Sequence, residues 1–378
     1  MAMRNSIIYH LTTVHPWNDN RIYEKMVKGL AARRWRVVYI APLAKNKPPF
    51  ELNITFVPLP ARNDLVGRIA RLLKAFFFLQ SQAPSILHFH DPEILLIAWI
   101  LRRKGWRIVY DVHEDYTLAI QVKHYIPNLF KPIARFLINH IEDRASRAFD
   151  LVLAERAYQK RFPKGRLVLN YPNEPSFDRT VSKLEPTTVP PRILYTGTVS
   201  EERGALLFAP LLRALASLEL HVIGRCDEDL RRRILSSAVD VRDRLIFRAD
   251  ENGVPHSRII EEYKKHDWAF GIAVFPYTDH YAEKELTKFF EYISYGIPIL
   301  CSNFPAWIRL IDANHIGITI APDNLFEDCE RKVKPVISDF FLWKSLRDRC
   351  KSLAKRYTWD SQLSILEDLY NEILSRQT

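Results

Sequence analysis

Residues 280–303 read HYAEKELTKFFEYISYGIPILCSN, a helix-like segment followed at once by a strand-like one. The apolar residues of the first segment recur at helical spacing and predict a helix over 284–295: Leu286, Phe289, Phe290 and Ile293. The apolar run at 298–302 predicts a buried strand. Alternation of helices with buried strands is typical of a doubly wound parallel sheet, so this stretch predicts an α/β fold.

The same alternation runs through the first half of the chain. Short apolar runs there predict buried strands over 6–13, 35–41, 54–59, 85–89, 107–112, 149–154 and 167–170. Segments between these runs predict helices over 21–33, 65–79, 92–104 and 120–147. The first half is therefore expected to form one parallel sheet covered by helices.

A second series begins after residues 173–191, which are rich in Pro, Ser and Thr and are typical of an interdomain linker. Its predicted strands cover 192–196, 220–223, 245–247, 268–273, 298–302 and 317–320. Its predicted helices cover 205–217, 227–238, 257–266 and 284–295. We expect two doubly wound domains that face a cleft at the carboxyl ends of their strands, where open α/β sheets bind ligands.

The composition excludes several classes of protein. The 378 residues are 47% hydrophobic and 26% charged, which argues against a disordered or fibrous chain. The four cysteines form no C-x-x-C pair, so we expect a reducing compartment and neither a disulfide framework nor a zinc site. We expect no secretory signal, and no apolar run approaches the ~18 residues of a transmembrane helix. These features predict a cytoplasmic protein.

The positive charge is concentrated in the first half of the chain. Residues 1–172 hold 27 Lys and Arg against 13 Asp and Glu, a net charge of +14, whereas the whole chain carries +11. This asymmetry indicates an anionic partner, with nucleic acid and the inner face of the cell membrane as candidates. Segments 65–79 and 120–147 combine basic and aromatic residues, as interfacial helices do. A solvated basic surface with core-facing aromatic residues explains the same composition, and both interpretations stay open.

Two carboxylates in the opening stretch are candidates for ligand binding. Glu283 and Glu291 are eight positions apart, just over two helical turns, so they face the same side of a helix that begins near Glu283. The free N–H groups at the start of such a helix bind phosphate, and Lys288 adds a positive charge. An ordinary amphipathic helix with solvated carboxylates is the alternative interpretation.

The segment YTGTVSEERG at 195–204 follows the first predicted strand of the second domain. Gly197 permits a tight turn and a close approach of a ligand. Arg203 is suited to pair with a phosphate through two parallel hydrogen bonds. The segment is neither a G-x-G-x-x-G fingerprint nor a Walker P-loop, so alone it does not identify a ligand.

Polar residues follow two predicted strands of the first domain: His88, His90 and Asp91 after one, and Asp111, His113, Glu114 and Asp115 after the next. Imidazoles and carboxylates at strand ends are suited to hydrogen bonding with a polar ligand or to proton transfer. They are also common metal ligands, although we expect no metal here. For His113 a ligand contact and a structural role both stay open at this point, whereas we expect His88 to be structural.

Two acidic motifs have a structural alternative. Asp19 lies in the loop after the first strand, where it either contacts a ligand or caps the following helix. The D-x-D motif at Asp227–Asp229 is of a kind that holds a metal in some enzymes. It lies at a predicted helix start, where acidic residues favour the helix dipole, so we interpret it as a cap.

Together these residues resemble the retaining glycosyltransferases of the GT-B fold, glycosyltransferase family 4 type. Glu283-x7-Glu291 matches the E-x7-E motif of that superfamily, and TKFFEYISYGIP at 287–298 resembles its KLFEYMAxGxP form. Five further segments resemble a branch that builds bacterial surface polysaccharides: His15–Pro16, Asp19–Ile22, His88–Glu93, Tyr110–Asp115 and Asn170–Asn173.

This resemblance implies two Rossmann-like domains. Residues 1–172 would bind the acceptor, residues 192–356 would bind the nucleotide-sugar, and residues 357–378 would form a helix that crosses back onto the first domain. The implied reaction moves a sugar from a UDP- or GDP-sugar to a hydroxyl of a glycan or lipid-linked acceptor, with retention of anomeric configuration. The resemblance implies no metal or other cofactor, and a role in polysaccharide or glycolipid synthesis, with peripheral contact to the membrane.

The resemblance also implies roles for individual residues. The donor diphosphate would be held by Gly197, Arg203, Leu286, Thr287 and Lys288. Glu291 would hydrogen-bond the ribose, Glu283 would contact the donor sugar, and His113 would reach that sugar from the first domain. The acceptor would lie near Asp19 and Arg21.

The sequence departs from the family pattern at two positions. Thr198 stands where the family often has an Arg, and His15-Pro-Trp17 replaces a common Gly-Gly turn. Other function classes therefore stay open: a sugar-nucleotide epimerase or phosphorylase of the same fold, an inactive scaffold, or a non-enzyme that binds nucleic acid or membrane. We find no nucleic-acid recognition motif and expect no nucleic-acid partner.

Overall fold

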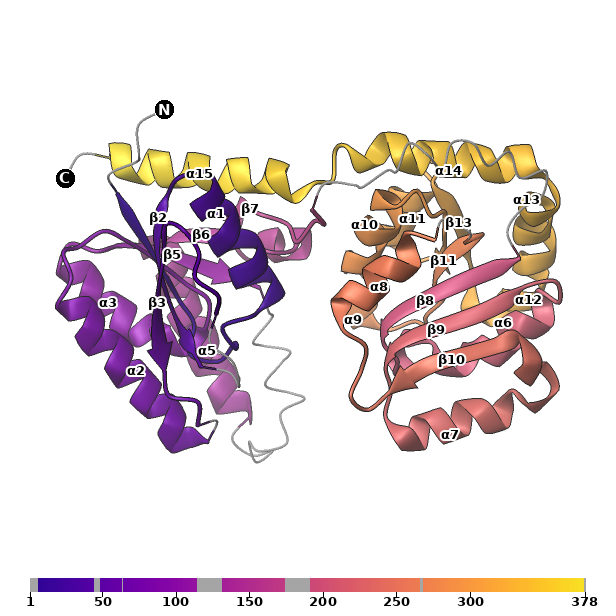
Figure 1. The fold of residues 1–378 in the computed structure, drawn as a ribbon, viewed down its shortest axis with the longest axis horizontal. Helices are drawn as coiled ribbons and strands as arrows, with labels where there is room; N and C mark the ends of the chain where they lie inside the picture. Colours follow the sequence, from indigo (N-terminus) through magenta and orange to yellow (C-terminus); the bar gives the residue numbers. More distant parts are fainter. Residues whose placement is uncertain are drawn as a thin grey trace. The chain divides into compact units, whose positions relative to one another are not determined.

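The computed structural model describes residues 6–43, 48–62, 64–113, 131–173, 191–265 and 268–376. The chain divides into two compact units: unit 1 comprises residues 1–170 with 359–378, and unit 2 comprises residues 171–358. Each unit contains one parallel β-sheet covered by helices (Figure 1). Nearly all of the linker predicted at 173–191, and the first part of the helix predicted at 120–147, lie outside the described residues.

The sheet of unit 1 is parallel, with strand order β3-β2-β1-β4-β5-β6-β7. Its strands are β1 (Ile7–Leu11), β2 (Arg36–Pro42), β3 (Ile54–Leu59), β4 (Ile86–Phe89), β5 (Arg107–Val112), β6 (Asp150–Leu153) and β7 (Arg166–Leu167). Its helices are the π-helix η1 (Asn20–Val27), α1 (Lys28–Ala32), α2 (Leu65–Gln80), η2 (Pro92–Ile94), α3 (Leu95–Arg103), α5 (Lys131–Ala148), η4 (Arg156–Lys160) and α15 (Trp359–Ser375). The predicted strands and described helices of this half are confirmed to within a few residues.

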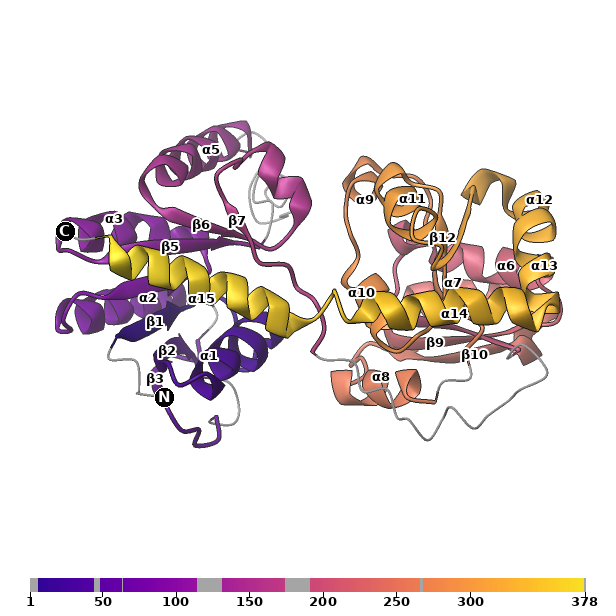
Figure 2. The same ribbon diagram turned by 90° about the horizontal axis from the view of Figure 1, so that it is seen from above.

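Helices cover both faces of this sheet. Leu87 and Phe89 of β4 pack against α2, α3 and α5, whereas Ile86 belongs to the core formed with η1, α1 and α15. Because side chains alternate along a strand, His10 of β1 and His88 of β4 point to the α15 face. Figure 2 shows α15, in yellow, running across the sheet of unit 1.

The C-terminal helix α15 returns to unit 1, as predicted. Its Trp359 donates a hydrogen bond from Nε1 to the Lys25 carbonyl at 3.0 Å. The side-chain oxygen of Gln362 accepts from the Leu169 N–H at 2.8 Å, and Leu366 is fully buried. The last helix is therefore part of the first core rather than an appendage of unit 2.

The sheet of unit 2 is also parallel, with strand order β10-β9-β8-β11-β12-β13. Its strands are β8 (Arg192–Thr198), β9 (Glu219–Arg225), β10 (Leu245–Asp250), β11 (Phe270–Ala273), β12 (Ile299–Ser302) and β13 (Gly317–Ile320). Its helices are η6 (Glu201–Arg203), η7 (Ala205–Leu207), α6 (Phe208–Ala214), α7 (Glu228–Ser237), η8 (Val239–Arg244), α8 (His256–Tyr263), α9 (Asp279–Ala282), α10 (Thr287–Ser294), α11 (Pro305–Ile311), η9 (Pro322–Asn324), α12 (Leu325–Asp328), η10 (Cys329–Val333), α13 (Lys334–Ser338) and α14 (Phe340–Ala354).

One predicted boundary in unit 2 is wrong. The helix predicted over 284–295 begins only at Thr287, and a separate short helix, α9, ends at Ala282. Thr278 caps α9 through its side chain, and Leu286 takes an extended conformation, so the chain turns between the two helices. Glu283 therefore does not share a helix with Glu291.

One smaller prediction is confirmed, and the state of the cysteines is described beside it. The Asp227 carboxylate accepts hydrogen bonds from the N–H groups of Asp229 and Leu230, which makes the D-x-D motif a helix cap. All four cysteines are free and buried.

Candidate functional site

In unit 2, one glycine lies at the end of β8 and another in the turn that follows it. Gly197 has φ +96°, and a Cβ there would enter open space. Gly204 has φ +76°, and a Cβ there would overlap the carbonyl oxygen of Val274. Left-handed conformations favour glycine, and the second position also demands it for close packing. Close packing against Val274 therefore fixes the backbone at Gly204, whereas the backbone at Gly197 remains accessible.

Arg203 lies immediately before Gly204. Its Nε donates to the Tyr281 hydroxyl at 2.9 Å, and its NH1 group lies 3.5 Å from the Thr198 carbonyl oxygen. Tyr195 donates from its hydroxyl to the same carbonyl at 2.7 Å. The guanidinium has neutral oxygen partners in these contacts, so its positive charge remains available to an anion.

Lys288 lies in the first turn of α10. Its Nζ is buried, has no hydrogen-bond partner within the described residues, and lies 3.7 Å from the centre of the Tyr195 ring. Burial lowers the pKa of Lys288 well below its ordinary value; nearby Arg203 lowers it further, and Glu291 opposes this. A buried amine without an acceptor is costly, so this position favours an incoming anion.

The start of α10 adds backbone donors beside Lys288. Leu286 is the N-cap residue, and its side chain provides no hydrogen bond to the first turn. Thr287 follows as an exposed residue. Because the first N–H groups of a helix lack intrahelical partners, an uncapped start binds anions well. Leu286, Thr287 and Lys288, selected from the sequence, therefore lie at one helix start whose free N–H groups are suited to an anion.

Glu291 is held by two side chains that the sequence did not single out. Its Oε2 accepts from the Tyr263 hydroxyl at 2.8 Å, and its Oε1 lies 3.0 Å from His256 Nε2. Tyr263 also lies 2.8 Å from the hydroxyl of Thr196, at the end of β8. The carboxylate is thereby fixed in orientation, and each of its oxygens retains a lone pair for a ligand hydroxyl. Glu283, by contrast, is exposed at the end of α9.

In unit 1, residues in and just after β1, β4 and β5 form one buried polar network. Asp111 accepts from Arg21 Nε at 3.1 Å and from Arg21 NH2 at 2.8 Å. His90 Nδ1 lies 3.0 Å from Asp111, and His90 Nε2 lies 3.1 Å from His10 Nδ1. Burial alone raises the pKa of Asp111, but Arg21 and His90 together hold it well below its usual range. Arg21 therefore balances a buried carboxylate.

The network extends to the C-terminal helix. Tyr370 of α15 places its hydroxyl 2.6 Å from His88 Nδ1 and 3.2 Å from His10 Nε2. Burial lowers the pKa of both histidines well below the ordinary value, and their histidine neighbours lower it further. The imidazoles are therefore neutral near pH 7. This arrangement fits the expectation that His88 is structural.

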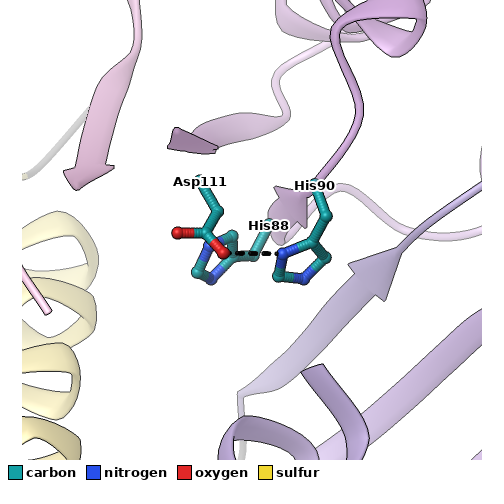
Figure 3. A group of neighbouring side chains, drawn as sticks. All are labelled: His88, His90 and Asp111. Atoms are coloured by element: carbon teal, nitrogen blue, oxygen red, sulfur yellow. Dashed lines mark hydrogen bonds and ion pairs between the residues drawn. The ribbon is translucent and has the colours of Figure 1, made fainter. Parts of the chain in front are cut away.

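Figure 3 shows His88, His90 and Asp111, which bring one ligand-type atom each within 4.8 Å of one another. This is the geometry of a candidate metal site. However, Asp111 is already neutralised by Arg21, whose fixed charge beside the carboxylate repels a second cation. The chemistry of the cluster therefore favours an internal ion pair, and metal independence stays a prediction.

His113 follows β5 and contacts the loop after β1. Its Nδ1 lies 3.2 Å from the backbone carbonyl oxygen of Asp111, and its Nε2 lies 2.9 Å from His15 Nε2. Burial lowers the pKa of His113, and the Asp111 carboxylate opposes this. His113 is therefore a neutral imidazole near pH 7. Glu114 and Asp115, which follow it, lie outside the described residues.

Asp19 caps η1, which is the structural alternative raised from the sequence. Its Oδ1 accepts from the N–H groups of Arg21 and Ile22, both at 2.8 Å. Burial alone raises the pKa of Asp19, but hydrogen bonds from His15 and Ile22 lower it to about 2. The roles of Asp19 and Arg21 in acceptor binding stay predictions; the structure gives both residues partners within unit 1.

The comparisons with known proteins identify the class of fold. Residues 20–161 match the sequence model of the Glycosyl transferase 4-like domain. No curated protein matches the chain. Among solved structures, WaaG, a glycosyltransferase involved in lipopolysaccharide biosynthesis, is similar with a TM-score of 0.64 and 15% identity over 98% of this chain and 100% of that chain.

Two further solved structures are similar over nearly their whole length. A trehalose-6-phosphate synthase, studied for glycosyl transfer with retention, has a TM-score of 0.64 and 10% identity over 97% of this chain and 99% of that chain. HepE from Anabaena, solved in complex with UDP, has a TM-score of 0.63 and 10% identity over 97% of this chain and 100% of that chain. Together with the two parallel sheets and the returning C-terminal helix, these likenesses show that the chain has the GT-B fold.

Proposed function

We propose that this protein is a retaining glycosyltransferase that moves a sugar from a nucleotide-sugar to a hydroxyl of a glycan or lipid-linked acceptor. The observation that carries the proposal is the buried Nζ of Lys288, which has no hydrogen-bond partner in the described part of the chain and lies at the uncapped start of α10. The match of residues 20–161 to a glycosyltransferase domain supports it, as does UDP in the complex of HepE.

In this proposal unit 2 binds the donor. The N–H groups at Leu286, Thr287 and Lys288 hold the diphosphate together with the Lys288 and Arg203 side chains. Gly197 lets the backbone approach the phosphates. Glu291 accepts hydrogen bonds from the ribose hydroxyls.

The donor sugar is assigned to Glu283 of unit 2 and to His113 of unit 1. The bond from the anomeric carbon to the phosphate oxygen breaks, and negative charge grows on the leaving diphosphate. Preorganised N–H groups and cations stabilise that charge more strongly than the ground state, which accelerates the reaction. The acceptor oxygen bonds to the same face of the carbon, and its proton passes to the leaving phosphate, so the configuration is retained. We propose no metal in this step.

Binding of a nucleotide panel tests the donor site. Calorimetry with UDP, GDP, ADP and their sugars, all with EDTA present, is expected to identify one tightly bound nucleotide. Glu291→Ala should weaken that binding, whereas Glu327→Ala, on the exposed helix α12, should not. Failure of every nucleotide to bind the wild type would remove the donor site. Conversion of a nucleotide-sugar to its epimer without any acceptor would favour the alternative of an epimerase.

A surface of unit 1 supports a membrane-associated acceptor. Four apolar residues of α2 recur on one helical face, and each is at least 50% exposed: Val66, Ile69, Leu73 and Phe77. Leu96 and Ile100 of the neighbouring helix α3 are exposed too, and α3 ends in Arg102 and Arg103. Exposed apolar residues beside basic ones fit an anionic lipid surface. Within the described ranges no helix is long and apolar enough to cross a membrane.

Vesicle binding tests this surface. We expect co-sedimentation with phosphatidylglycerol vesicles, weaker binding to phosphatidylcholine, and loss of binding in the double variant Leu73→Ser/Phe77→Ser. Phe341→Ser is the matched control, because Phe341 is 80% exposed but lies in unit 2. Equal binding of the double variant and the control would contradict the assignment.

A further inference from the structure

The contacts of His113 define which of its ring nitrogens carries the proton. The Asp111 backbone carbonyl, 3.2 Å from Nδ1, can only accept a hydrogen bond. Nδ1 of a neutral His113 must therefore carry the hydrogen, which leaves Nε2 with a lone pair. The group opposite that lone pair is His15 Nε2 at 2.9 Å. His15 must accordingly donate, and His113 must accept.

His15 is surrounded by groups that favour its donor role. Its Nδ1 lies 3.6 Å from Asp19 of its own loop, and its Nε2 lies 3.5 Å from Asp91, which follows β4. A carboxylate can only accept a hydrogen bond, so both groups favour a hydrogen on the imidazole nitrogen that faces them.

The loop that carries His15 is anchored to the sheet. The His15 N–H donates to Thr12 Oγ1 at 3.0 Å, and Thr12 in turn donates to Asp91 at 2.8 Å. The Thr13 N–H donates to the same carboxylate at 2.6 Å. Asp91 therefore fixes the loop and faces the His15 ring at once, so the imidazole has a defined place.

We propose that His15 is a positioning residue for His113: its donation from Nε2 to His113 Nε2 acts together with the weaker 3.2 Å contact of Nδ1 to the Asp111 carbonyl, and both contacts are needed to fix the tautomer and ring orientation of that imidazole. Asp19 and Asp91 keep the donating hydrogen on His15. The inference rests on the proposed function for its catalytic meaning, because His113 is the residue assigned there to the donor sugar. The tautomer itself does not depend on that function.

Nitrogen-detected NMR of histidine side chains tests the tautomer without any substrate. In the wild type at pH 7.5, His113 is expected to show a protonated Nδ1 and an unprotonated Nε2. His15→Ala should mix the two tautomers, whereas His15→Gln, which keeps an N–H donor at a similar position, should preserve the wild-type pattern. His315→Asn is the control, because His315 is exposed in unit 2 and Asn tolerates its φ of +51°. A wild-type His113 protonated at Nε2, or an unchanged pattern in His15→Ala, would overturn the proposal.

Kinetics then test the catalytic consequence. Loss of an outer partner of a functional imidazole typically costs about 10- to 100-fold, so we expect a fall of that size in kcat for His15→Ala. The KM for the nucleotide-sugar should change little, because the contacts proposed for the nucleotide itself belong to unit 2. His15→Gln should restore most of kcat, and His15→Ala should add little to His113→Ala. An equal loss in the Ala and Gln variants would contradict positioning by hydrogen bonding. A wild type without transferase activity would instead remove the proposed function and leave the NMR result to decide the inference.

Discussion

Lys288 and Arg21 both bury a basic group, but among the described residues only the Arg21 guanidinium donates hydrogen bonds to a carboxylate. Arg21 forms two hydrogen bonds to Asp111, so its charge is balanced within unit 1. Lys288 lies on the Tyr195 ring without a hydrogen-bond acceptor among the described residues. Natural proteins rarely keep such a group for stability, and an unpaired buried charge is more typical of a binding site.

The variant Lys288→Met separates binding from stability. Removing this buried amine should leave the free energy of unfolding unchanged or raise it, because no hydrogen bond within the described residues is lost and the Met side chain can still pack on the Tyr195 ring. Loss of a charge-assisted contact should weaken nucleoside diphosphate binding by about 10- to 100-fold. Calorimetry and urea unfolding measure the two effects. Lys334→Met, at an exposed position on α13, is the control. A large loss of stability with unchanged affinity would assign Lys288 to the core.

Gly197 and Gly204 both have a positive φ but differ in the space around them, so alanine variants at the two positions can be compared. Gly197→Ala is expected to cost about 1–2 kcal/mol, the price of a left-handed residue with a side chain, because its Cβ meets open space. Gly204→Ala should cost more, since its Cβ overlaps the Val274 carbonyl and the turn must move. Thermal unfolding ranks the variants. Equal costs at the two positions would show that the packing at Gly204 is not tight.

Single residues also show which side-chain contacts could be predicted from the sequence and which could not. The sequence predicted that Lys288 and Glu291 lie close together on one helix, because both belong to one short motif, and both lie in α10. Tyr263 and His15 were missed as partners, since they lie 28 and 98 positions from the residues they contact. Spacing along the chain gives no sign of such pairs. The partner of a strand-end residue depends on which strands are neighbours in the sheet.

At the scale of elements, α15 is the part of the chain most distant in sequence from the core it completes. Its apolar side buries Leu363, Leu366 and Tyr370 against the sheet of unit 1. Leu366→Ala is expected to destabilise the protein by about 2–5 kcal/mol, because a fully buried leucine leaves a cavity. Asp368→Ala, on the exposed side of the same helix, should change stability by less than about 0.5 kcal/mol. Urea unfolding compares them, and similar effects would mean that α15 does not pack as described.

Helices and strands were predicted well from the sequence where a single clear pattern of apolar residues defined them. The buried strands read as short apolar runs because a parallel sheet buries both of its faces. The start of α10 was placed three residues too early, because residues 284–286 continue an amphipathic pattern although the chain turns there. Local propensity does not record that α9 ends at Ala282, where the Thr278 cap and tertiary packing decide the path.

At the scale of the whole molecule, the histidine network predicts an acid-sensitive unit 1. The ordinary pKa of histidine is 6.5, and burial lowers the pKa of His10 and His88 well below it in the folded state. Below about pH 6.5 the unfolded chain therefore binds more protons. Stability falls as pH falls, by up to about 1.4 kcal/mol per pH unit for each histidine, and this contribution is constant above that pH.

Hydrogen exchange read by mass spectrometry checks this prediction. Peptides from β1 and β4 should lose protection between pH 7.5 and 5.5, after correction for the intrinsic exchange rate. Peptides from β12 in unit 2 provide the internal reference, because that strand carries no histidine. Equal protection of β4 at both pH values would contradict the buried neutral imidazoles.

Real-time proton NMR of a nucleotide-sugar incubated with the protein tests the proposed reaction most directly. The donor is the sugar of the nucleotide that binds best, and water is a slow substitute for the acceptor. The account predicts release of nucleoside diphosphate and a first-formed sugar anomer with the donor's configuration, both lost in Lys288→Met. First appearance of the opposite anomer would contradict retention. Epimerisation of the intact nucleotide-sugar, or no nucleotide consumed even with a lipid-linked acceptor, would contradict glycosyl transfer itself.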